Sequence, residues 1–91
     1  MIPDDLYQTI LDRKAHPKPG SYTNSLFDAG LARIAQKVGE EGTEVVVAAL
    51  SQENDRLVEE AADLAYHLLV LLAAKGITPQ EVAQELEKRK K

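Results

Sequence analysis

Apolar residues recur at helical spacing along this chain, and segments rich in glycine, proline or small polar residues interrupt the pattern. The period of about 3.6 residues predicts helices over residues 2–14, 26–50 and 54–74, and a further helix from residue 79. Almost no segment alternates between apolar and polar positions as a half-buried strand would. The pattern therefore predicts an all-α fold, a small bundle of four to five helices in a single domain spanning residues 1–91.

Start and stop signals predict where these helices begin and end. The second helix is expected to break at Gly30, and it is preceded by four candidate N-caps, Ser21, Thr23, Asn24 and Ser25. Asn54 or Asp55 is expected to cap the third helix, which Gly76 should end. The sequence Thr-Pro-Gln-Glu from Thr78 is a capping box with proline at the first helical position.

Length limits what one copy of the chain can bury. A chain of 91 residues buries only about 60–65% of the surface that its unfolded form exposes, so a single core would be thin. The 54–74 helix is apolar nearly all round, which favours burial on almost every side. Both features favour a partner subunit that covers more of the apolar surface.

Composition bears on the compartment. The absence of cysteine excludes disulfides and thiolate metal sites, and the first ten residues lack the pattern of a signal peptide. The longest apolar-rich stretch, residues 64–74, is too short for a bilayer core of about 30 Å. These features predict a cytoplasmic protein without a membrane segment.

Charge is distributed unevenly around a net value of −4. Between residues 40 and 63 there are eight acidic residues and a single base, Arg56. A segment of this kind repels phosphate unless a cation intervenes, so direct binding of nucleic acid is not expected.

Some of these acids occupy positions that should be buried. At about 100° per residue, Ile34, Val38, Val45 and Ala48 form the apolar stripe of the 26–50 helix, and Glu41 falls inside that stripe. Beside the stripe one strip carries cations first and carboxylates after them, in the order Arg33, Lys37, Glu40 and Glu44. The one polar gap of the 54–74 helix holds Glu60, Asp63 and His67.

A buried carboxylate is costly unless it is paired or binds a metal. Lys37 and Arg33 can satisfy at most two of the five carboxylates, which are Glu40, Glu41, Glu44, Glu60 and Asp63. All-oxygen ligands indicate a hard cation, Mg²⁺ or alternatively Mn²⁺, which also takes phosphate oxygens as ligands. The pattern therefore favours chemistry on a phosphate anhydride.

The motif Glu40-Glu41-x-x-Glu44, followed by Glu60-x-x-Asp63, resembles the metal signature of the all-α nucleoside triphosphate pyrophosphohydrolases, the MazG-like superfamily. Over nearly the whole chain, the segments SYTNSLFDAGLARIAQKVGEEGTEVVVAAL and LVEEAADLAYHLLVLLAAKGI resemble the phosphoribosyl-ATP pyrophosphohydrolase family. Gly42 departs from the alanine common in that family, at a cost to the helix of up to about 1 kcal/mol.

This resemblance implies Mg²⁺-dependent hydrolysis of phosphoribosyl-ATP to phosphoribosyl-AMP and pyrophosphate, the second step of histidine biosynthesis, in a homodimer. A separate phosphoribosyl-AMP cyclohydrolase would be the functional neighbour. The expected metal ligands are Glu41, Glu44, Glu60 and Asp63. Glu40 would be the general base, Lys37 and Arg33 would neutralise the leaving pyrophosphate, and Ser21 and Thr23 would hold another phosphate.

Other interpretations stay open for several of these residues. Lys37 and Glu41 also suit a simple ion pair, Ser21 and Thr23 suit helix capping, and His67 suits a hydrogen bond that orients a neighbouring carboxylate rather than a metal ligand. Tyr22 and Tyr66 would stack on adenine or pack, and His16 has no assigned role. Two alternative functions remain, a house-cleaning hydrolase of noncanonical or deoxynucleoside triphosphates and a non-catalytic helical dimerisation module.

Overall fold

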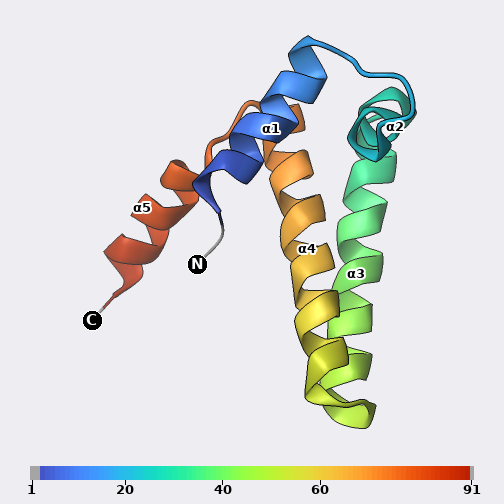
Figure 1. Ribbon diagram of the computed structural model, residues 1–91. Helices are drawn as coiled ribbons and strands as arrows, with labels where there is room; N and C mark the ends of the chain where they lie inside the picture. The colour runs from blue at the N-terminus through green and yellow to red at the C-terminus, as the bar shows by residue number, and fades with distance from the viewer. Residues whose placement is uncertain (1–2, 91) are drawn as a thin grey trace.

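The computed structural model describes residues 3–90, which form five helices and no strand (Figure 1). The helices are α1 (Asp4–Ala15), α2 (Tyr22–Ala29), α3 (Leu31–Ser51), α4 (Asn54–Lys75) and α5 (Pro79–Arg89). The predicted all-α fold of four to five helices is confirmed, although Ile2 of the predicted first helix lies outside the described residues. None of the described helices combines the length and the apolar composition needed to span a membrane.

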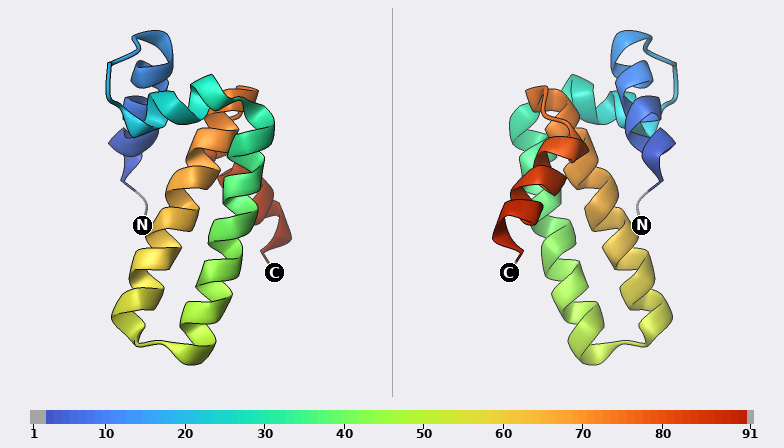
Figure 2. Two further views of the ribbon diagram at one scale, coloured as in Figure 1. Left: turned by 90° about the vertical axis from the view of Figure 1, so that its right-hand side faces the viewer. Right: turned by 90° about the vertical axis from the view of Figure 1, so that its left-hand side faces the viewer.

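The two longest helices, α3 and α4, form an antiparallel hairpin (Figures 1 and 2). α1 packs against α4 at the end of the hairpin that lies away from its turn, and α2 joins α1 to the start of α3 at that same end. α5 follows the end of α4 and lies clear of the hairpin in Figure 1. The hairpin is therefore covered at one end and consists of two helices alone toward its turn.

The apolar core lies at the covered end, where α1, α2, the beginning of α3 and the end of α4 meet. Its buried members are Tyr7, Ile10, Leu26, Ile34, Leu69, Val70 and Ala73. Two polar contacts strengthen the same junction, because the Tyr7 hydroxyl donates to the carbonyl oxygen of Ile77 over 2.6 Å and Lys14 Nζ donates to that of Ala73 over 2.9 Å. Burial of apolar surface thus fixes how α3 and α4 enter the hairpin.

Several predicted helix boundaries are confirmed, although α2 begins at Tyr22 and not at Leu26. The Ser21 side chain caps α2 by accepting from the Asn24 backbone N–H, Gly30 separates α2 from α3, and Thr78 opens α5 with a complete capping box. The prediction that Asn54 or Asp55 caps α4 is wrong. Glu53 is the N-cap because its backbone is extended and its carbonyl oxygen accepts from the first turn, so Asn54 and Asp55 are already helical.

The expectation that α4 is buried on nearly every side is wrong for a single copy of the chain. Val58 is 68% exposed and Leu68 is 41% exposed. On the facing helix Val46, Val47 and Leu50 are exposed as well. The two-helix part of the hairpin therefore presents apolar side chains to its surroundings.

Gly30→Ala is expected to lower the free energy of unfolding by about 1–3 kcal/mol. Gly30 has φ 98° and ψ 170°, a conformation that residues with a Cβ rarely adopt, and no atom lies within 4 Å of an added Cβ. The loss is thus backbone strain without a clash. Urea unfolding would measure it, with Gly39→Ala as the control. Gly39 is helical and equally open, so its replacement should stabilise by up to about 1 kcal/mol, and equal losses in both variants would contradict the assignment.

Candidate functional site

Three carboxylates from two helices meet on the facing sides of α3 and α4. Glu41 of α3 and Glu60 and Asp63 of α4 each offer one oxygen, and these oxygens all lie within 4.8 Å of one another. Glu41 and Glu60 are only 6% and 7% exposed, whereas Asp63 is exposed. We call these three residues the acidic cluster. The i, i+3 spacing places Glu60 and Asp63 on one face of α4, and the hairpin brings Glu41 opposite them.

Each buried glutamate of the acidic cluster has one oxygen on a cation and one without a partner. Glu41 Oε1 lies 3.2 Å from Lys37 Nζ, and Glu60 Oε1 accepts a hydrogen bond of 2.8 Å from Arg56 Nη2. Among residues 3–90, Oε2 of Glu41 and Oε2 of Glu60 are buried without a hydrogen-bond partner. Unpaired buried carboxylate oxygens are costly, so this all-oxygen donor set fits a hard divalent cation.

The cationic side of the site is formed by Lys37. Its hydrogen bond to Glu41 raises the pKa of Lys37 above its ordinary value, and burial acts in the opposite direction. The nearby Tyr22, Glu41 and Glu40 add to the rise of the pKa. Lys37 therefore remains a cation at neutral pH, in contact with the acidic cluster through Glu41.

Glu40 lies at the outer edge of the acidic cluster. It accepts from Gln36 Nε2 over 2.9 Å, and its oxygens lie 3.6 Å from Lys37 Nζ and 3.8 Å from Arg33 Nη1. The strip predicted on this helix, with its cations ahead of its carboxylates, is thus present on α3. The Glu40 side chain is 45% exposed, which leaves its carboxylate open to water.

Glu44 lies outside the group of three. With Val47, Gln52, Arg56 and Glu60 it lines a small hollow of about 170 Å³ nearer the hairpin turn. The hollow is shared with Glu60, so Glu44 borders the acidic cluster without belonging to it.

His67 is buried, and both of its ring nitrogens have partners. Nδ1 lies 2.7 Å from the backbone carbonyl oxygen of Asp63, and Nε2 lies 2.8 Å from the Tyr22 hydroxyl. The interpretation that His67 orients a neighbouring carboxylate is wrong, because its contact is with the main chain of Asp63. The reason is geometric, since the carbonyl four residues earlier in a helix lies within reach of the ring.

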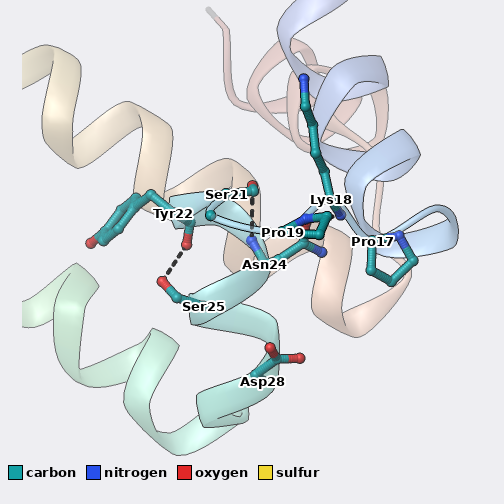
Figure 3. Close-up of a pocket in the computed structure, with 9 residues that line it drawn as sticks. Pro17, Lys18, Pro19, Ser21, Tyr22, Asn24, Ser25 and Asp28 are labelled. Atoms are coloured by element: carbon teal, nitrogen blue, oxygen red, sulfur yellow. Dashed lines mark hydrogen bonds between the residues drawn. The ribbon is translucent and has the colours of Figure 1, made fainter.

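The start of α2 borders an open hollow of about 630 Å³, which Figure 3 shows. Ser21 lines this hollow and accepts from the Asn24 N–H over 3.2 Å, while the Tyr22 ring points away from the prolines on the opposite side. Thr23 is hydrogen-bonded to the Tyr66 hydroxyl. Ser21 thus caps α2, and Tyr66 packs against Tyr22 with ring centroids 6.2 Å apart.

Sequence reasoning assigned no contact within the site to two residues, Arg56 and Asn24. Arg56 stands four residues before Glu60, a spacing that already indicates an ion pair. Asn24 was considered only as a cap, yet it is buried and bonds both to the last turn of α1 and to the loop that follows α1. Its Oδ1 accepts from the Lys18 N–H over 2.8 Å, and its Nδ2 donates to the Arg13 carbonyl over 2.7 Å. Nothing in the spacing around Asn24 signals these loop contacts.

Comparison with known proteins gives a consistent result. The family model described as phosphoribosyl-ATP pyrophosphohydrolase matches residues 4–90. The chain is 52% identical over 88 residues to a protein of Sulfurisphaera tokodaii, covering 97% of this chain and 94% of that protein. It is 53% identical over 88 residues to one of Sulfolobus acidocaldarius, covering 97% and 93%, and 49% identical over 90 residues to one of Saccharolobus islandicus, covering 99% and 96%. All three relatives are named phosphoribosyl-ATP pyrophosphatase.

Proposed function

The chain belongs to the phosphoribosyl-ATP pyrophosphohydrolase family, and we propose on this basis that it hydrolyses phosphoribosyl-ATP to phosphoribosyl-AMP and pyrophosphate. This reaction is the second step of histidine biosynthesis, and in the cytoplasm a cyclohydrolase would consume the phosphoribosyl-AMP. The observation that supports the chemistry most directly is the pair of buried, unpartnered oxygens on Glu41 and Glu60. The other oxygen of Glu41 contacts the protonated Lys37, so an anion-binding cation lies next to the proposed metal ligands.

The proposed metal is Mg²⁺, with Mn²⁺ as a substitute, held by Glu41, Glu60 and Asp63. Glu44 would contribute from the adjoining hollow that it shares with Glu60. When bound, a divalent cation neutralises phosphate charge and acidifies a coordinated water. Asp63 is the exposed member of the cluster, which leaves an opening for substrate oxygens.

The remaining roles follow from the positions of the side chains along α3. Release of pyrophosphate means that water adds to phosphorus while the bridging P–O bond between the α and β phosphates breaks. Glu40, open to water at the edge of the cluster, would accept the proton of that water. Lys37 and Arg33, both within 4 Å of Glu40, would stabilise the charge on the leaving pyrophosphate.

The start of α2 would hold a further phosphate of the substrate. Ser21 and Thr23 bring hydroxyl groups to a helix N-terminus, where free N–H groups favour anions. The Ser21 oxygen accepts from Asn24, which leaves its own O–H group available as a donor.

We further propose that the working unit is a homodimer. Val46, Leu50 and Val58 are exposed on the two-helix part of the hairpin, with Leu50 at 83%. Val58 also lines a mostly apolar hollow of about 440 Å³, together with Pro3, Leu6, Ala61, Ala62, Ala65 and Tyr66. A second copy would cover these side chains and give the acidic cluster the low-dielectric surroundings that a two-helix hairpin lacks. Light scattering of the purified protein would give the mass of the assembly.

The substrate assignment predicts a preference that one assay can measure. Purified protein with Mg²⁺ should release pyrophosphate from phosphoribosyl-ATP at least about tenfold faster than from ATP, dUTP or dCTP, because only the first carries the additional ribose phosphate that the start of α2 would bind. Pyrophosphate is measured with a coupled enzyme at equal substrate concentrations. Release from the deoxynucleotides but none from phosphoribosyl-ATP would support the house-cleaning alternative instead.

A further inference from the structure

Two side-chain contacts attach the first turn of α2 to α4. The Tyr22 hydroxyl meets His67 Nε2 at 2.8 Å, and Thr23 meets the Tyr66 hydroxyl. Tyr22 and Thr23 are the first two residues of α2 and directly follow its cap, Ser21. The end of α2 whose hydroxyls are proposed to bind a phosphate is thus held by consecutive residues of α4.

The contacts of His67 define which atom donates and which accepts in each of its hydrogen bonds. A carbonyl oxygen only accepts, so Nδ1 carries the proton toward Asp63, and in the neutral ring Nε2 accepts from the Tyr22 hydroxyl. The ring of His67 also stands edge-on to both tyrosines, at 79° to Tyr22 and 87° to Tyr66. Hydrogen bonds at both nitrogens and aromatic contacts fix the orientation of the imidazole.

Tyr22 links the His67 contact to Lys37, the cation beside the acidic cluster. Tyr22 is 51% exposed, yet its hydroxyl is bonded to a histidine that is only 5% exposed. It also lies near enough to Lys37 to contribute to the raised pKa of that side chain. One aromatic residue at the first position of α2 therefore lies near Lys37 and reaches α4 one turn after Asp63.

We propose that Tyr22 and His67 are positioning residues, which hold the start of α2 at a fixed place relative to Asp63 and thereby align the substrate phosphate with the acidic cluster. The role rests on the proposed function, because it concerns how that substrate is held. It requires no contact between His67 and the reacting atoms. Its effect should appear in substrate binding more than in the rate of the bound complex.

Tyr22→Phe tests the role with the smallest change, because it removes only the hydroxyl. The KM for phosphoribosyl-ATP is expected to rise about tenfold with kcat changed less than about twofold, a size typical of one hydrogen bond. Amide hydrogen exchange in the first turn of α2 should also accelerate, and this readout needs no activity. Tyr7→Phe is the matched control, since it removes a hydroxyl hydrogen bond of 2.6 Å in the core and should lower the melting temperature without changing KM.

Substitutions of His67 separate its two hydrogen bonds. His67→Asn keeps a donor near the position of Nδ1 but has no atom at the position of Nε2, so it should resemble Tyr22→Phe. The double variant with Tyr22→Phe should be no worse than either single change, because both remove the same contact. His67→Gln places an amide oxygen near Nε2 and should recover part of the lost affinity.

The possible results separate the positioning role from the proposed function. Unchanged KM and unchanged exchange in Tyr22→Phe would overturn the role, as would additive losses in the double variant. A wild-type protein inactive on phosphoribosyl-ATP would refute the proposed function alone. In that case faster exchange in the first turn of α2, absent from Tyr7→Phe, still supports the attachment, and unchanged exchange overturns it.

Discussion

Asp63→Asn is expected to reduce turnover of phosphoribosyl-ATP about 100-fold or more, while the metal-free protein stays as stable as the wild type or becomes more stable. Asp63 is exposed, and its carboxylate has no hydrogen bond or ion pair within residues 3–90. Its negative charge faces Glu41 and Glu60, so in the absence of a cation removing it relieves repulsion. Steady-state kinetics and chelator-treated thermal unfolding measure the two halves of the prediction.

Asp12→Asn provides the matched control for this change. Asp12 is also an exposed aspartate, but it lies on α1 and pairs with Arg13 and His16, outside the acidic cluster. Its replacement should leave turnover within about twofold of the wild type. Glu44→Gln should behave as Asp63→Asn does, and Glu41→Gln should lose turnover likewise, although it also breaks the contact of Glu41 with Lys37. A marked loss of stability in the metal-free Asp63→Asn and Glu44→Gln variants would show instead that these two carboxylates serve structural ion pairs.

Saturating Mg²⁺ is expected to raise the melting temperature by about 10–20 °C. A ligand at 100 times its dissociation constant stabilises the folded state by about 2.7 kcal/mol, and each kcal/mol is worth about 4–8 °C in a domain of this size. The physical source is the orphaned oxygen on each of Glu41 and Glu60, which gains a partner only in the folded hairpin. Calorimetry across a Mg²⁺ titration measures the shift.

Two controls test whether the rise in melting temperature comes from Mg²⁺ bound at the acidic cluster. NaCl at matched ionic strength should give a much smaller shift, since screening acts on all charges and does not fill the site. Asp63→Asn should lose most of the Mg²⁺ effect while keeping the response to salt. A melting temperature that does not change with Mg²⁺ would favour the non-catalytic dimerisation module.

Local features of the structure follow directly from the sequence. Ser21 and Thr78 cap helices because a short hydroxyl side chain reaches N–H groups two or three residues ahead. Gly30 interrupts the long apolar pattern because its φ of 98° suits a residue without a Cβ. The strip from Arg33 to Glu40 is equally local, since i, i+3 and i, i+4 neighbours meet on any helix.

Which residues come together in the site depends on contacts between helices. Whether Glu41 or Glu44 faces Glu60 and Asp63 depends on the register of α3 against α4, which the core at the far end of the hairpin sets. His67 belongs to the polar gap of α4 by spacing, yet its partners are a main-chain carbonyl and a tyrosine 45 residues away. No periodicity encodes such a pairing.

The sequence by itself thus determined the helices, the caps of α2 and α5 and which faces carry charge, because these depend on residues within a turn or two of one another. Only the tertiary structure decided which three carboxylates converge, which of their oxygens stay without a partner, and that Tyr22 reaches His67. Those properties arise when burial of the core fixes the distance and rotation between helices, and a shift of α3 by one residue would turn Glu41 out of the cluster.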